Sequence, residues 1–425
     1  MGDTAAASDV ARRVGAVLVS FLAVTAAISL APIQDAVSGG PVGFAEQTRP
    51  IAYLLGAPLF GIWDSLSLLS LSQHYAVLAT LVALYLGSVS RARRWTVPGR
   101  SLRAWAVREA GRAGSALLLL VTFYAAGVVL PRPMTGIRLS EPDLVAIDFH
   151  SHTHYSHDGW SLFSAARNRE WHEGGGFDVA YVTDHYTWAG VDEAARDNPQ
   201  RVGERTVLIS GAEIRIHRRP TNILGDRSRY LGALDADSVY MDPELLADEA
   251  RRSGRPPTLL YTMPGGLEWV LPFTADLPSG MIGIEINDGS PRGLEQVRSQ
   301  RREIIALADS MDLALIGAAN LHGWGRTVAS WSIMEIPGWQ EMTPEGVGDA
   351  IEATLHRERR AAVQVLERRM PYHDGSPLLV VTSLPWLTME HFRMLSLDER
   401  ASWLLWIAVV VAGMTLRDRR RDLRA

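Results

Sequence analysis

The 425-residue sequence contains no cysteine, which excludes disulfide bonds and thiolate metal ligands without indicating a compartment. It also contains no lysine, so every basic side chain is an arginine. The formal net charge is only -5, which is too small to indicate a nucleic-acid partner, and none is expected. Histidine is scarce, with 12 in the chain. The length leaves room for two or three domains.

Apolar residues are concentrated in the first 131 positions and again after Ser402. A bilayer helix needs roughly 20 mostly apolar residues. The first apolar run could be a cleaved signal peptide, but Pro32 would follow the cut, and we expect an uncleaved anchor instead. A shorter run at 51–63 suits an interfacial or re-entrant segment. The predicted spans are residues 14–31, 66–89, 113–130 and 401–416.

Arginines flank these runs and indicate an orientation. Seven arginines lie between positions 91 and 112, and five more lie in the tail at 417–425. Positively charged loops remain in the cytoplasm. We therefore expect a multi-pass protein of the cytoplasmic (inner) membrane, with the N-terminus, the arginine-rich loop and the tail inside. Residues 131–400 would then be extracytoplasmic.

From Asp143 onward, short apolar β-rich runs alternate with helical stretches, which indicates an α/β fold with a parallel sheet or a β/α barrel. The predicted organisation is a membrane region at 1–131, a barrel at 140–340, a helix and membrane-proximal segment at 341–400, a span at 401–416 and the tail. Residues 344–370 should form one long charged helix. Strands are expected at 144–149, 179–183, 207–214, 229–234, 258–262, 281–286 and 313–318, and helices at 162–173, 243–252 and 294–310.

Potential metal ligands follow successive predicted strands. The stretch "DFHSHTHYSHDGW", residues 148–160, holds four of the histidines and two aspartates. His150 and His152 are two positions apart, so on a strand they share a face and could hold one ion together. His185, Glu213 and His322 lie at later strand ends. In a β/α barrel these ends converge on one mouth, where chemistry is built.

These motifs resemble those of the PHP family, named for polymerase and histidinol phosphatase. The resemblance covers residues 143–340 and rests on "DFHSHTHYSHDG", "VTDH", "GAEI", "IEIND" and "NLH". It implies a distorted seven-stranded β/α barrel with up to three metal ions, used in most members for phosphoester hydrolysis. It also implies that Asp184 is a ligand or a partner beside the ligands, and that His154 and His157 are not ligands. The implied metal positions are His150, His152, Asp158, His185, Glu213, Asn320 and His322.

Three positions depart from the family pattern. Asn222 and Met263 stand where the family has histidines that serve one ion, and Asn320 replaces a carboxylate. A thioether is a poor ligand for hard or borderline cations. We therefore expect two ions at most, one at His150, His152 and Glu213 and one at Asp158, His185 and His322. Imidazole and carboxylate ligands suit zinc, manganese or iron.

The leading hypothesis is a metal-dependent hydrolase of phosphoesters. Asp184 could take or relay a proton, Arg326 is a second candidate catalytic residue, and Arg215 and Arg218 could bind phosphate. The substrate would be a small-molecule or a lipid or cell-envelope phosphoester. Two alternatives stay open: hydrolysis of an amide or carboxylic ester, and a reduced barrel that binds a ligand or metal without turnover. The tryptophans at 324, 331 and 339 could rim the site or pack a helix.

Overall fold

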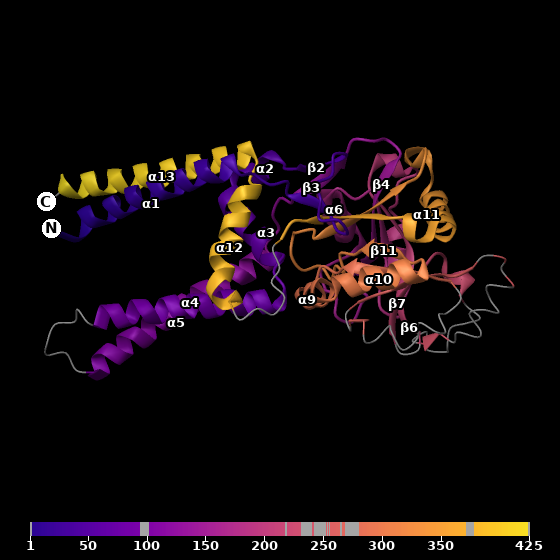
Figure 1. The fold of residues 1–425 in the computed structure, drawn as a ribbon, viewed down its shortest axis with the longest axis horizontal. Coiled ribbons are helices and arrows are strands. Elements are labelled where there is room, and N and C mark those ends of the chain that lie inside the picture. The colour runs from indigo at the N-terminus through magenta and orange to yellow at the C-terminus, as the bar shows by residue number, and fades with distance from the viewer. Residues whose placement is uncertain are drawn as a thin grey trace.

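The computed structural model describes most of the chain and shows two parts, an α/β domain and a set of long helices that extend from one side of it (Figure 1). The described residues are 2–93, 102–216, 219–230, 240–241, 252, 254, 256–263, 266–267, 280–370 and 378–423. Most of the predicted helix at 243–252 and most of the predicted strand at 229–234 lie outside them.

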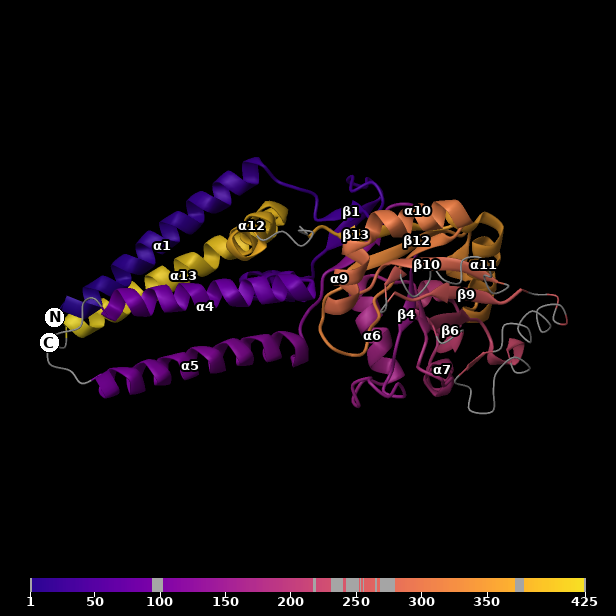
Figure 2. The ribbon, with the colours of Figure 1, turned by 60° about the horizontal axis from the view of Figure 1, so that its bottom comes forward.

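Four long helices extend in the same direction from the domain (Figure 2). α1 lies along α13, so that both chain ends lie at the far end of the bundle (Figure 1). α4 meets α5 where the Tyr85 hydroxyl donates a hydrogen bond to Glu109 O, at 3.2 Å. The helices are α1 (Gly2–Ala27), α4 (Leu71–Arg93), α5 (Leu102–Val129) and α13 (Leu397–Asp422).

Three helices of the described chain are long and apolar enough to cross a membrane, at Ser8–Ala27, Arg103–Val129 and Leu397–Arg420. These correspond to three of the predicted spans and are compatible with membrane association. The predicted span at 66–89 is largely occupied by α4, a helix of 23 residues that is not among the three.

Shorter helices lie between the long ones and the domain. The predicted interfacial run at 51–63 forms α2 (Ile51–Leu55) and α3 (Ala57–Ser67), and the chain bends between them at Gly56. The third short helix, α12 (Leu379–Met394), packs on α4 and α1 and contains Pro385.

Asp64 on α3 joins the helices to the α/β domain. The side chain is fully buried, and its carboxylate lies 2.7 Å from Arg132 and 3.1 Å from Arg368. Thr327 and Tyr53 donate hydrogen bonds to the same carboxylate, at 2.8 and 3.0 Å. Two arginines and two hydroxyls thus compensate one buried acid.

The domain is built on one curled sheet in which the described chain contributes eleven strands, ten of them in the order β1-β13-β12-β4-β5-β6-β7-β9-β10-β11. β4, β5 and β6 are parallel, as are β9, β10 and β11, while β7, β12, β13 and β1 join antiparallel. The strands of this path are β1 (Ile33–Asp35), β4 (Leu144–Ser151), β5 (Val179–Val182), β6 (Val207–Ile216), β7 (Arg219–Leu224), β9 (Thr258–Tyr261), β10 (Met281–Asn287), β11 (Ala314–Gly317), β12 (Ser330–Glu335) and β13 (Gln364–Arg368).

The remaining strands are short. β8 (Tyr240–Met241) pairs with β6, and β2 (Ala45–Thr48) pairs with β3 (Gly136–Leu139) in a separate ribbon. The curl brings β11 back toward β12, where Ser332 Oγ accepts a hydrogen bond from Gly317 N and donates one to Gly317 O.

The predicted strand number of seven is wrong, because antiparallel strands extend the parallel core. The predicted helix at 344–370 is also wrong in its second half: α11 (Pro344–Glu358) ends before Arg359, which has a positive φ of 52°, and the chain continues as β13. This strand was not predicted because its sequence contains charged residues. Its Glu367 is buried and receives two hydrogen bonds from Arg301, at 2.8 and 2.7 Å.

Helices cover the outside of the curled sheet (Figure 2). The predicted helix at 294–310 is divided into two by a break at Gln300. The Ser164 side chain caps the start of α6. Gly176 caps its end with a left-handed φ of 76°, and the chain then turns toward β5. The covering helices are α6 (Ala165–Gly175), α7 (Ala189–Ala195), α9 (Pro291–Ser299), α10 (Arg301–Met311) and α11.

Candidate metal site

Strand ends bring the predicted ligands together. His150 is near the end of β4 and His152 follows it, while His185 follows β5 and forms a bridge to Glu213 within β6. His322 follows β11, and its neighbour Leu321 bridges to Ser151. Neighbouring parallel strands end at one edge, which is why residues far apart in sequence meet there.

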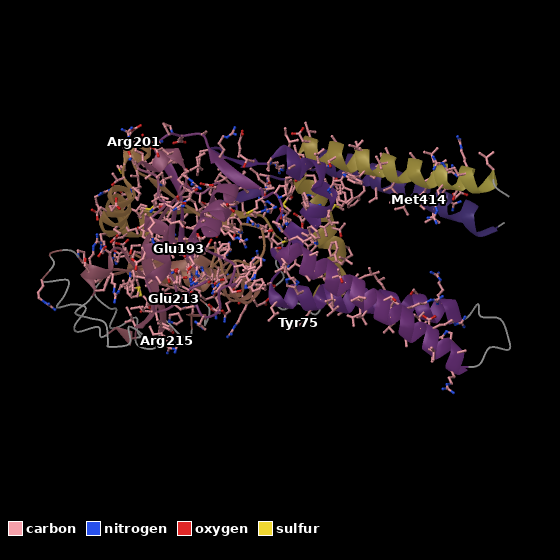
Figure 3. The ribbon with its side chains drawn as sticks, turned by 180° about the vertical axis from the view of Figure 1, so that it is seen from behind. Tyr75, Glu193, Arg201, Glu213, Arg215 and Met414 are labelled. Atoms are coloured by element: carbon pink, nitrogen blue, oxygen red, sulfur yellow. The ribbon has the colours of Figure 1, made fainter. Side chains whose placement is uncertain are left out.

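The Glu213 carboxylate faces three imidazoles. Its Oε2 lies 3.0 Å from His150 Nε2, 3.5 Å from His152 Nε2 and 3.4 Å from His185 Nδ1. Glu213 is labelled within the domain in Figure 3. His150, His152 and Glu213 offer ligand atoms that all lie within 4.8 Å of one another, and all three are buried. This is the set that the sequence assigned to one ion.

A second set lies on the solvent side of the first. Asp158 Oδ2 is 3.4 Å from His185 Nε2 and 3.2 Å from His322 Nε2. The His152 ring stacks on both imidazoles, with centroids 4.1 Å from His322 and 4.6 Å from His185. His152, His185 and His322 form a further ligand-compatible group, so His152 links the first set to the two imidazoles of the second.

His154 and His157, which were not expected to be ligands, lie in different surroundings. His157 is exposed but joins Asp158 and His185 in a third group with ligand-compatible spacing. His154 Nε2 instead points toward Glu193, at 3.9 Å from its carboxylate. The geometry therefore adds His157 to the residues that could reach an ion.

A serine fixes the protonation of His152. Ser156 Oγ donates to Asp184 and accepts from the backbone N–H of His185, which leaves it an acceptor for His152 Nδ1 at 2.9 Å. With its proton on Nδ1, His152 presents an unprotonated Nε2 toward Glu213. In the described structure this buried Nε2 has no hydrogen-bond partner. An orphaned imidazole nitrogen facing a carboxylate fits a divalent cation.

Asp184 contacts the loop that carries the ligands, and its predicted catalytic role stays a prediction. It is fully buried and accepts hydrogen bonds from Thr153 N at 2.6 Å, Thr153 Oγ1 at 2.7 Å and Ser156 Oγ at 3.1 Å. Burial raises its pKa, and these three donors oppose the rise. Its contacts go to the loop that carries the ligands rather than to an imidazole.

Glu285 orients His150 and was not among the predicted site residues. Its Oε1 lies 2.6 Å from His150 Nδ1, and its Oε2 accepts from Met263 N at 2.8 Å. Burial raises the pKa of Glu285 to about 7. Burial and the neighbouring imidazoles hold the pKa of His152 well below its usual value, which favours the neutral ligand form. The motif "IEIND" contained the signal for Glu285.

The three replaced positions all lie beside the site. Asn320 has a positive φ of 44°, and its Nδ2 donates to Asp288 at 2.9 Å. Asn222 is the Cα partner of Glu213 across β6 and β7. The side-chain oxygens of both asparagines are buried and have no partner within the described structure. Met263 is fully buried.

The predicted arginines do not contact the imidazoles in the described structure. Arg326 is half-buried, and its Nη1 lies 4.0 Å from the Met134 sulfur. Arg215 is exposed on β6, two residues after Glu213, and is labelled near the edge of the domain in Figure 3. Arg218 lies outside the described residues. Their roles stay predictions.

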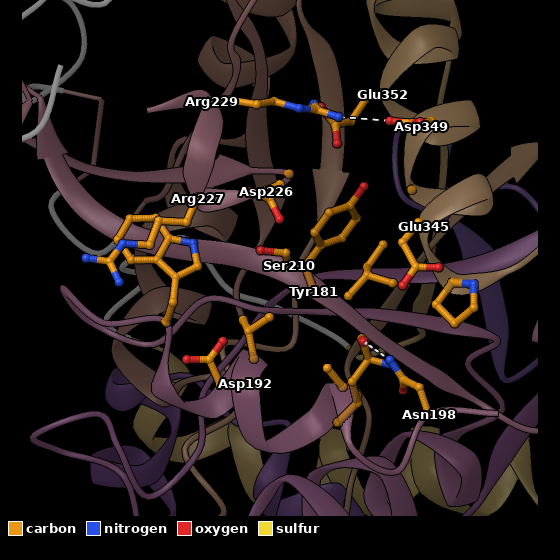
Figure 4. A pocket seen from close by; sticks show the side chains of 18 residues that line it. Tyr181, Asp192, Asn198, Ser210, Asp226, Arg227, Arg229, Glu345, Asp349 and Glu352 are labelled. Atoms are coloured by element: carbon orange, nitrogen blue, oxygen red, sulfur yellow. Dashed lines mark hydrogen bonds and ion pairs between the residues drawn. The ribbon is translucent and has the colours of Figure 1, made fainter. Parts of the chain in front are cut away.

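A cavity of about 270 Å³ lies elsewhere in the domain, between β5, β6, α7 and α11 (Figure 4). Tyr181 and Asp192 are among its lining residues, and Arg229 closes one side through ion pairs with Asp349 and Glu352. None of the predicted site residues lines it, so it is separate from the histidine cluster.

No protein-family model and no curated protein matches the chain. Solved structures resemble it at low identity. PsfC from Pseudomonas syringae PB-5123 is 17% identical, with a TM-score of 0.36 over 58% of this chain and 98% of PsfC. A two-domain protein from Bacteroides vulgatus, containing a predicted PHP-like metal-dependent phosphoesterase, is 16% identical, with a TM-score of 0.32 over 53% of this chain and 65% of that one.

The lesion-specific endonuclease PfuEndoQ from Pyrococcus furiosus is 14% identical, with a TM-score of 0.35 over 49% of this chain and 56% of the endonuclease. The chain thus spans less than two thirds of the endonuclease and of the Bacteroides vulgatus protein. Similarities with TM-scores below 0.5 assign neither a family nor an activity by themselves.

Proposed function

We propose that the protein is a metal-dependent hydrolase of phosphoesters. The observation that carries the proposal is the unpartnered Nε2 of His152, buried between the Glu213 carboxylate and two further imidazoles. His150, His152 and Glu213 would hold one cation, and His185, His322 and Asp158 would hold another. Divalent cations supply a nucleophile near neutral pH and stabilise developing negative charge on phosphate oxygens.

The protein's own residues keep these groups in place. Glu285 holds the His150 ring, and the chain from Asp184 through Ser156 holds the proton of His152 on Nδ1. Such supporting contacts raise the basicity of a ligand and fix its orientation. Asp158 is half-open to solvent between His185 and His322, at the side from which a substrate could enter.

The test is turnover of a generic aryl phosphate by the full chain in detergent, with and without manganese or zinc. We expect metal-dependent phosphate release that is lost in His152→Ala, because this residue is a ligand of the first set and its imidazole also lies within ligand distance of His185 and His322. His154, which is only partly exposed and points toward Glu193 instead of the cluster, serves as the control, and His154→Ala should retain activity. Metal binding by the wild type without any turnover would overturn the hydrolase proposal.

One set of observations favours a second candidate, a barrel that binds a ligand without turnover. Asn222 and Met263 lie beside Glu213 and Glu285 and replace ligands that the resemblance implies. This candidate predicts that metal binding responds to phosphate or phosphonate. It also predicts no turnover of phosphoesters, carboxylic esters or amides.

We also propose that the α/β domain lies outside the cytoplasmic membrane. Both chain ends lie at the far end of the helix bundle, as do the C-terminal end of α4, which carries Arg91, and the N-terminal end of α5, which carries Arg103 (Figures 1 and 2). The C-terminal end of α13 carries Arg417, Arg419 and Arg420. Alkaline phosphatase fused after Pro142 should be active, and a fusion after Arg100 inactive. The opposite pattern would reverse the orientation.

A further inference from the structure

A second cavity of about 270 Å³ lies where the helix bundle meets the loops of the candidate metal site. α3, α4 and α5 form one wall, and the loops at 289–291 and 324–327 form the other. Most of the lining is apolar, and the groove is defined here by Trp63, Leu66, Tyr124, Val128, Pro291 and Trp324.

Two stacked tryptophans connect the groove to the loops that carry the potential ligands. Trp324 lines the groove two residues after His322, and it stacks on Trp160 with ring centroids 5.2 Å apart and an interplanar angle of 18°. Trp160 lies two residues after Asp158, and its backbone N–H donates to His322 O at 2.9 Å. The groove residue Trp324 is therefore two residues from His322, and the tryptophan on which it stacks is two residues from Asp158.

Apolar side chains also remain exposed in these two loops. Trp324 is 48% exposed, and Leu162 and Tyr155, from the loop that carries Asp158, are 59% and 41% exposed. Large apolar side chains gathered beside a polar site are typical of a surface that meets an apolar ligand or a membrane. A small water-soluble phosphoester would not need them.

The groove continues into a candidate membrane span. Tyr124 and Val128 belong to the last turns of Arg103–Val129, which is almost entirely exposed within the structure. The site loop is fixed to this span, because Gly325 N donates to Val128 O at 3.0 Å. Tyrosine and tryptophan concentrate at membrane–water interfaces. A hydrocarbon chain in the outer part of the bilayer would thus lie next to the groove.

We propose that the groove binds the hydrocarbon chain of an amphipathic phosphoester whose headgroup reaches the histidine cluster. The substrate class is a lipid-linked phosphoester rather than a freely soluble one. The proposal rests on the proposed function, and it selects one of the substrate classes that the sequence left open. Three observations support this proposal. They are the apolar lining of the groove, the adjoining candidate span and the position of Trp324 two residues after His322.

Binding of non-hydrolysable phosphonates tests this independently of catalysis. The full chain, in phosphatidylcholine nanodiscs with manganese, is titrated with ethylphosphonate and decylphosphonate, and empty nanodiscs correct for partitioning. We expect the decyl compound to bind at least tenfold more tightly, since each buried methylene favours binding by up to about fourfold. Val128→Trp, which fills the groove, should reduce the ratio to near one. Val121→Trp, at an exposed position of the same helix, should leave it as in the wild type.

Equal binding of both phosphonates, or a ratio that Val128→Trp leaves intact, overturns the groove proposal while the hydrolase proposal stands. Preferred binding of the decyl compound without turnover of any phosphoester supports the groove and overturns the hydrolase. A change of oligomeric state in Val128→Trp, measured by mass photometry, would identify a second copy as the occupant and also overturns it.

Discussion

Nδ1 of His150 lies 2.6 Å from the Glu285 carboxylate, and both side chains are buried. The other nitrogen of the ring faces Glu213 at 3.0 Å, so Glu285 orients the imidazole toward the ligand cluster. Glu285→Gln keeps the size of the side chain but removes its charge and one of its two acceptors. We expect metal affinity to fall about 10-fold or more with the fold intact. Titration of the metal-free protein measures this, with the exposed Glu335→Gln as control. An unchanged affinity would mean that Glu285 only fills space.

Ser156 should matter for metal binding although it is not a ligand. Its hydroxyl connects Asp184 to His152 Nδ1. Ser156→Ala removes the acceptor that keeps the proton on Nδ1, so the proton can move to Nε2 and block the ligand atom. The expected result is a loss of affinity of about 10- to 100-fold, read by the same titration. Ser310→Ala, at an exposed helix position, is the control, and equal affinities in the two variants would contradict this role.

The ligand cluster could be predicted from the sequence because its members lie in short motifs at strand ends. His150 and His152 share a strand end, and His185 stands beside Asp184 in "TDH". The sequence placed Glu213 and His322 with them through the convergence of parallel strands, and the structure brings these residues together. Contacts that depend on side-chain direction were not accessible. Glu285 meets His150 across 135 residues, and Ser156 was one hydroxyl among several in the opening motif.

Strands that carry charge were missed for a similar reason. β13 contains Glu367 and Arg368, and their charges are compensated by Arg301 and by Asp64 from distant elements. Without those partners the sequence reads as a continued charged helix. Burial of a paired charge is a property of the tertiary structure, so composition alone could not indicate it.

Asp64 should be important for the attachment of the helices to the domain. Asp64→Asn leaves Arg132 and Arg368 without their buried counterion. Removing one partner of a buried ion pair costs about 3–5 kcal/mol. We expect a clear fall in the Tm of the detergent-solubilised protein and faster proteolysis between α5 and β3. The exposed pair of Asp309 and Arg360 is the control, because Asp309→Asn should hardly change the Tm.

Asp178 predicts a pH dependence of stability. Burial raises the pKa of this carboxyl to about 7. The hydrogen bond that it accepts from Ala146 N opposes the rise but does not cancel it. A raised carboxyl pKa favours the protonated folded state, so the stability it contributes is present below about pH 4 and is lost as the pH rises through 7. Asp178→Asn removes this loss. The variant should therefore gain about 1–2 kcal/mol relative to the wild type between pH 5 and 8, seen as a Tm difference that grows with pH. A constant difference would contradict the assignment.

The number of bound ions should be two at most. Asn222 and Met263 both lie beside the carboxylates of the site, Asn222 as the strand partner of Glu213 and Met263 through its amide on Glu285. An amide oxygen adds no charge, and a thioether is a mismatched ligand for zinc, manganese or iron. Asn222→His combined with Met263→His should raise the metal content by one ion per chain, measured by elemental analysis. Either single change should add much less, because one imidazole and a shared carboxylate leave an ion under-coordinated. Three ions in the wild-type protein would falsify this account of the replaced ligands.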